Sequence, residues 1–115
     1  MNKILWKPAN TSETHFNKFI DLVNITYDQD LRTYDELYHW SINNISQFWE
    51  TSLEYSDIEY QGTYKKALDS LHMAPGVKWF TGLNLNFAEN LLKYRDDQTA
   101  IISKIENHPA KQISY

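Results

Sequence analysis

The hydrophobic positions between residues 12 and 27 recur at helical spacing. The apolar residues three or four positions apart are Phe16, Phe19, Ile20, Val23 and Tyr27. Such spacing places them on one face of a helix. The polar run before them, residues 10–13, has the composition of a capping box, with Asn10 three positions before Glu13. We therefore expect a helix from about Ser12 to Tyr27, ended by the polar residues 28–30.

Two further helices are expected between residues 33 and 55. Thr33 with Glu36 repeats the capping pattern and predicts a short helix through Trp40. Residues 41–44 interrupt the pattern, because Ser and Asn side chains compete for nearby backbone groups. Asn44 with Gln47 can then cap a third helix. Its apolar residues are Ile45, Phe48, Trp49 and Leu53.

The pattern after residue 56 mixes extended and helical signals. Residues 56–62 are expected as a connection or as a short extended piece around Ile58 and Tyr60, whereas residues 64–71 are at best weakly helical. Pro75-Gly76 predicts a turn, and the alternation at residues 77–80 is compatible with a short strand.

The last third of the chain predicts one helix and a hairpin. Asn86 with Glu89 forms another capping box and should open a helix. Residues 99–103 and 112–115 then resemble two strands joined by a turn at residues 106–109. The predicted fold class is thus mainly α with a small β component: a helical N-terminal leader followed by a C-terminal β-hairpin. Because an isolated hairpin is marginal in water, a chain that stops inside one looks cut.

Composition narrows the classes of protein to which the chain can belong. Its 115 residues, 42% hydrophobic and 15% aromatic, suffice for one packed domain. The chain lacks cysteine, which excludes disulfides, thiolate catalysis and Cys-based zinc sites. A formal net charge of −4 with scattered Lys and Arg argues against a nucleic-acid partner. Without a signal-peptide core or an apolar run of about 20 residues, no membrane partner and a cytoplasmic location are expected.

No group of residues in the sequence forms an evident active site. The four histidines, at positions 15, 39, 72 and 108, lack metal-ligand spacing and are expected at or near the surface. Neighbouring carboxylates fall in turns and helix starts, where capping and the helix dipole favour them. The three glycines stand too far apart for a phosphate-binding loop. We therefore expect no catalytic, cofactor-binding or metal-binding residue in this chain.

One stretch is unusual enough to suggest a family. The segments WFTG at residues 79–82 and LNFAENLL at residues 85–92 resemble the N-terminal signature of acetoacetyl-CoA synthetases. These enzymes belong to the adenylate-forming acyl-CoA synthetase superfamily, near the acetyl-CoA synthetases. Further matching segments are Trp40-Ser41, Phe48-Trp49, Ala100–Ile102 and Ile113–Tyr115. The chain departs from the pattern at Thr81 and Phe87, where the family often has Pro and Tyr.

The resemblance implies that the chain is one piece of a larger ligase. Full-length members would convert acetoacetate, ATP and CoA to acetoacetyl-CoA, AMP and pyrophosphate through an acyl-adenylate, with Mg bound to the ATP. Their phosphate loop, ribose-binding aspartate and mobile-domain lysine lie downstream, so no catalytic residue is carried over and whether this chain is itself an enzyme is left open. Residues 1–97 correspond to the N-terminal helical domain, and residues 98–115 to the opening hairpin of the adenylating domain.

The residues that carry the resemblance are candidates for docking against the missing adenylating domain. They are Trp40, Phe48, Trp49, Trp79, Phe80, Gly82, Asn86 and Asn90. Core packing is the simpler account of Trp79-Phe80, and the two asparagines are better explained as a cap and a backbone-bonding side chain than as ligands. An uncovered aromatic surface predicts self-association of the isolated chain. The alternative function is a stand-alone helical protein-interaction module with an aromatic docking face.

Overall fold

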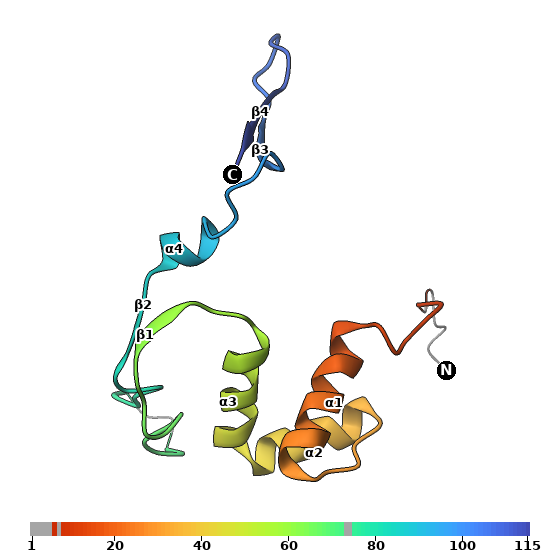
Figure 1. The fold of residues 1–115 in the computed structure, drawn as a ribbon, viewed down its shortest axis with the longest axis vertical. Helices are drawn as coiled ribbons and strands as arrows, with labels where there is room; N and C mark the ends of the chain where they lie inside the picture. Colours follow the sequence, from red (N-terminus) through yellow and green to blue (C-terminus); the bar gives the residue numbers. More distant parts are fainter. Residues whose placement is uncertain (1–5, 7, 73–74) are drawn as a thin grey trace. The chain divides into compact units, whose positions relative to one another are not determined.

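The chain folds into helices and short antiparallel strands that group into two compact units. A computed structural model describes residues 6, 8–72 and 75–115. Unit 1 comprises Met1–Asp57 and Tyr64–Thr81, and unit 2 comprises Ile58–Thr63 and Gly82–Tyr115. Figure 1 shows the order of the elements along the chain. The fold is mainly α with a small β component, which confirms the predicted class. The predicted domain boundary after residue 97 stays a prediction.

The described residues of unit 1 form three helices, coloured from orange to green in Figure 1. They are α1 (His15–Tyr27), α2 (Tyr34–Asn43) and α3 (Ile45–Tyr55). The predicted capping box at residues 10–13 is wrong, because the side-chain oxygen of Asn10 accepts the backbone N–H of Ser12 in a turn that precedes the helix. Helix α1 begins later, where the Thr14 hydroxyl accepts the N–H of Asn17 at 3.3 Å. It ends as predicted, at Asp28 in a left-handed conformation with φ 51°.

The capping box of α2 is confirmed in both directions. The Thr33 hydroxyl accepts the backbone N–H of Glu36 at 3.3 Å, and the Glu36 carboxylate accepts the N–H of Thr33 at 2.9 Å. The helix continues past the predicted end at Trp40 to Asn43. The side chains of Ser41 and Asn43 donate to carbonyls three and four residues earlier, so they bond along the helix instead of interrupting it.

The Glu36 cap predicts a specific pH dependence of stability. Hydrogen bonds from the backbone of Arg32 and Thr33 lower the pKa of Glu36 below its ordinary value of 4.5. The cap therefore contributes stability that is present above the unfolded-state pKa and is lost as the pH falls through the lowered folded-state pKa. We expect Glu36→Gln to flatten the loss of thermal stability in acid, measured by far-UV circular dichroism. Asp35→Asn removes a charge from the same turn and serves as the control. If wild type and Glu36→Gln lose thermal stability equally as the pH falls, the proposed cap is contradicted.

Helix α3 forms where predicted, but not with the predicted cap. No side chain caps its N-terminus. The Asn44 amide instead donates to the Trp40 carbonyl at 3.0 Å, which satisfies the end of α2. The chain bends between the two helices because Asn44 leaves the helical region, with φ −131° and ψ 51°.

The core of unit 1 is built mainly from α1 and α2. Its buried residues are Ile20, Val23, Leu37 and Trp40, surrounded by the partly buried Phe19, Tyr27, Leu31 and Phe48. The predicted stripe on α1 is thus confirmed except at its first member, since Phe16 is 38% exposed. A buried polar side chain links α3 to this core: the Thr51 hydroxyl donates to the Gln47 carbonyl at 2.9 Å, and its oxygen lies 3.3 Å from the Tyr27 hydroxyl oxygen. Burial of this hydroxyl therefore leaves no polar atom unsatisfied.

A side-chain amide fixes the connection between α1 and α2. The Asn24 side chain donates to the Leu31 carbonyl and accepts the Leu31 N–H, both at 2.8 Å. The Asn24 amide thus satisfies both backbone groups of Leu31, as a neighbouring strand would in a sheet. These two bonds hold the loop between α1 and α2 in place. Within the described parts of the chain, no helix combines the length and the apolarity needed to cross a membrane.

The remainder of unit 1, residues 64–81, follows an irregular path. It contains no helix among its described residues, in line with the weak helical signal at 64–71. Ala67 and Leu68 are buried, and Leu68 forms an isolated antiparallel bridge with Trp79. The predicted extended character of residues 77–80 is therefore reduced to one bridge.

Unit 2 begins with a small antiparallel sheet that the sequence predicts only in half. Strand β1 (Tyr60–Gly62) falls near the expected extended piece and pairs with β2 (Leu83–Leu85), which was not predicted. One end of this sheet, where Gly62 pairs with Leu83, needs glycine in both segments. A Cβ on Gly62 would lie 2.2 Å from the Gly82 carbonyl oxygen, and a Cβ on Gly82 would lie 2.3 Å from that of Thr63. The two backbones approach too closely for any side chain there.

The predicted helix and hairpin of unit 2 are both present. Helix α4 (Phe87–Leu91) is short, and strands β3 (Thr99–Ser103) and β4 (Lys111–Ser114) form the hairpin drawn in blue in Figure 1. The turn places Asn107 at φ 61°, in the predicted region. None of the described residues of unit 2 is buried. Unit 2 thus has regular secondary structure without a hydrophobic core of its own.

Candidate docking surfaces

The structure divides the eight residues nominated from the sequence between the two units. Unit 1 holds Trp40, Phe48, Trp49, Trp79 and Phe80. Unit 2 holds Gly82, Asn86 and Asn90. Their docking role stays a prediction, whereas their contacts show what each of them does inside its own unit.

Two of the residues in unit 1 belong to its interior. Trp40 is 8% exposed, and the centroid of its ring lies 5.3 Å from that of Tyr27. Phe48 is half-buried and meets the ring of Phe19 edge-to-face at 5.7 Å. Buried rings of this kind supply a large share of a small core's stability. We therefore assign Trp40 and Phe48 mainly to packing.

Trp49 and Trp79 form an indole pair that is only partly packed. Their ring centroids lie 5.5 Å apart at an interplanar angle of 71°, and the two residues are 45% and 37% exposed. The bridge to the buried Leu68 fixes the backbone of Trp79, while much of its ring stays open. Core packing, the simpler expectation for Trp79, thus accounts for only part of its surface. Exposed tryptophans are enriched where proteins meet partners.

Phe80 turns the chain at the end of unit 1. Its φ of 44° is positive, which is unusual for a bulky residue. Two contacts hold it there: its N–H donates to the Ala67 carbonyl at 2.8 Å, and its ring meets that of Tyr64 edge-to-face at 5.0 Å. The half-buried ring therefore stabilises an unfavourable backbone conformation.

An aromatic cleft of about 540 Å³ opens between the three helices of unit 1. The rings that line it are Phe16, Phe19, Tyr34, Tyr38, Phe48 and Tyr55. Stacking continues along one wall, where the Tyr34 ring lies 6.2 Å from that of Phe16 and 6.3 Å from that of Tyr38. Of the rings that line the cleft, only that of Phe48 belongs to the eight residues nominated from the sequence.

Several hydroxyl groups beside the cleft make local hydrogen bonds. Ser41 donates to the carbonyl of Tyr38, and Ser52 donates to the carbonyl of Phe48. The Tyr55 hydroxyl lies 2.8 Å from Nδ1 of His15. The cleft therefore offers mainly rings and apolar area, and these serine hydroxyls are already bonded to the helix backbone. The i, i+4 spacing of Tyr34 and Tyr38 on a predicted helix is the signal that could have found this wall.

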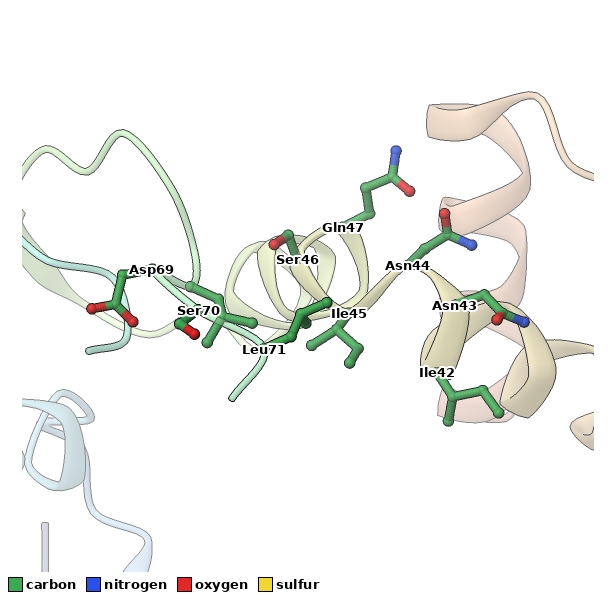
Figure 2. Close-up of a pocket in the computed structure, with 10 residues that line it drawn as sticks. Ile42, Asn43, Asn44, Ile45, Ser46, Gln47, Asp69, Ser70 and Leu71 are labelled. Atoms are coloured by element: carbon green, nitrogen blue, oxygen red, sulfur yellow. The ribbon is translucent and has the colours of Figure 1, made fainter. Parts of the chain in front are cut away.

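A smaller and more polar hollow lies where α2 gives way to α3 (Figure 2). Its volume is about 330 Å³, and its walls come from residues 42–47 and 68–71. The polar side chains here serve the backbone: Asn44 bonds the Trp40 carbonyl, and the Asp69 carboxylate accepts the N–H of Lys78 at 3.1 Å. The hollow thus holds no paired acid and base of the kind that proton transfer requires.

The titratable side chains elsewhere do not converge. All four histidines are exposed, as expected from the sequence. Across residues 6, 8–72 and 75–115, no three His, Asp or Glu side chains gather closely enough to hold a metal ion.

In unit 2 the two nominated asparagines act on the backbone, as the sequence predicted. The Asn86 side chain accepts the N–H of Glu89 at 3.2 Å and caps α4. The Asn90 side chain donates to the Glu59 carbonyl and accepts the Glu59 N–H, both at 2.8 Å. This repeats the two-bond pattern of Asn24 and ties α4 to the start of β1. The uncovered apolar surface of unit 2 lies outside these contacts.

Comparisons with known proteins identify one matching family model and several similar sequences. Residues 34–91 match the family model described as acetyl-coenzyme A synthetase N-terminus. The chain is 38% identical to a malonamoyl-CoA synthetase of Penicillium aethiopicum over 88% of its own length and 15% of the relative's. It is 37% identical to an acetoacetyl-CoA synthetase of Xenopus tropicalis over 90% of its length and 16% of the relative's, and 34% identical to one of Danio rerio over 91% and 16%. No solved structure matches the chain.

Proposed function

The chain belongs to the acetyl-coenzyme A synthetase N-terminus family, and on that premise we propose that it is the non-catalytic N-terminal segment of a longer acyl-CoA ligase. The chain spans about 15% of the length of the curated relatives that it matches. The proposed activity of the whole protein is the conversion of acetoacetate, ATP and CoA to acetoacetyl-CoA, AMP and pyrophosphate in the cytoplasm. Acetoacetate is the proposed substrate because the residue pattern at 79–92 resembles the acetoacetyl-CoA synthetases and departs from the acetyl-CoA synthetases.

One observation carries this proposal: unit 2 has no buried residue although it is rich in large apolar side chains. Phe87, Leu91, Ile102 and Ile113 are each more than half exposed. Removing apolar surface from water is the main favourable contribution to folding. Unit 2 lacks this contribution, because its apolar side chains stay exposed. We infer that an adenylating domain of the same polypeptide covers this surface in the whole enzyme, with residues 98–115 as that domain's opening hairpin.

The cofactors of the proposed reaction do not fit the residues described here. A phosphate cradle needs several glycine backbones close together and turned towards open space. Gly62 and Gly82 instead face carbonyl oxygens closer than 2.4 Å to the position of a Cβ, and Gly76, which does face open space, stands alone in its turn. We therefore assign ATP, its Mg and CoA to the rest of the proposed polypeptide. The proposed role of this chain is to pack against the adenylating domain and to lead into its first hairpin.

The isolated chain offers a direct test of the non-catalytic assignment. We expect titration with Mg-ATP, CoA and acetoacetate to leave its tryptophan fluorescence and backbone amide signals unchanged. Saturable binding of one of them would place a ligand site in this chain and overturn the assignment. The polypeptide that the source gene encodes should form acetoacetyl-CoA with release of AMP and pyrophosphate. A stop codon directly after Tyr115 would instead favour the stand-alone interaction module, for which the aromatic cleft is the supporting feature.

A further inference from the structure

We draw no further inference here: the strongest candidate, the aromatic cleft between the three helices of unit 1, is an uncovered apolar groove, and nothing in the structure shows what covers it.

Discussion

Replacing Gly82 with alanine should dismantle the β1–β2 sheet. The new Cβ would lie 2.3 Å from the Thr63 carbonyl oxygen, at a backbone φ of 106° that L-residues rarely adopt. The left-handed conformation alone costs about 1–2 kcal/mol. With the backbone overlap we expect a total loss of about 3 kcal/mol or more, towards the upper end for single substitutions. Hydrogen exchange at Tyr60–Gly62 and Leu83–Leu85 should accelerate to nearly the rate of an unfolded chain.

Gly76 supplies a matched control for that experiment. It has the same φ of 106°, but a Cβ there meets nothing within 4 Å. Gly76→Ala should therefore show the conformational cost alone and leave exchange in β1 and β2 unchanged. The Gly62→Ala variant should behave like Gly82→Ala, and the double variant should be no worse than either single one, because both break the same pairing. Equal effects at Gly76 and Gly82 would show that the close approach does not exist in solution.

Replacing Trp40 with alanine should cost unit 1 most of its stability. The side chain is 8% exposed, packs on Tyr27 and belongs to the buried cluster with Ile20, Val23 and Leu37. Truncating a buried tryptophan removes its transfer free energy and leaves a cavity, together about 3–5 kcal/mol. We expect this loss in the free energy of unfolding by urea, followed by far-UV circular dichroism.

The control is the same substitution at an exposed site. Trp49 is 45% exposed on α3, so Trp49→Ala should cost about 1 kcal/mol, mainly from its contacts with Phe48 and Trp79. Far-UV circular dichroism reports helix content and is independent of which tryptophan is removed. Similar losses for the two variants would show that Trp40 is not the centre of the core.

The sequence predicts those elements of this fold that rest on local signals. The Thr33–Glu36 box starts α2 and the Asn86 cap starts α4, since each needs only residues three positions apart. Strand β3 has the predicted bounds because its β-branched residues are flanked by turn formers. Helix starts failed at Asn10 and Asn44, where the same side chains found other backbone partners.

Long-range pairing was beyond the reach of sequence patterns. Strand β2 pairs with a segment about 20 residues earlier in the chain, and nothing in its three residues distinguishes it from a loop. The same holds for the Asn90–Glu59 bonds, which join residues 31 positions apart. The aromatic cleft also depends on how three helices pack, so Phe16 was expected in the core and was found on the cleft wall. The family resemblance identified the eight nominated residues. Only the structure shows which of them are buried in the core and which are exposed.

The two compact units are interleaved along the chain, which has a practical consequence for anyone who wishes to produce one alone. Residues 58–63 belong to unit 2 although residues of unit 1 both precede and follow them. A single truncation or a single proteolytic nick can therefore release neither unit whole. Unit 1 could be expressed separately only if residues 58–63 were excised and the cut ends rejoined by a designed linker. Unit 2 would in turn need β1 supplied as an added peptide or fused ahead of β2.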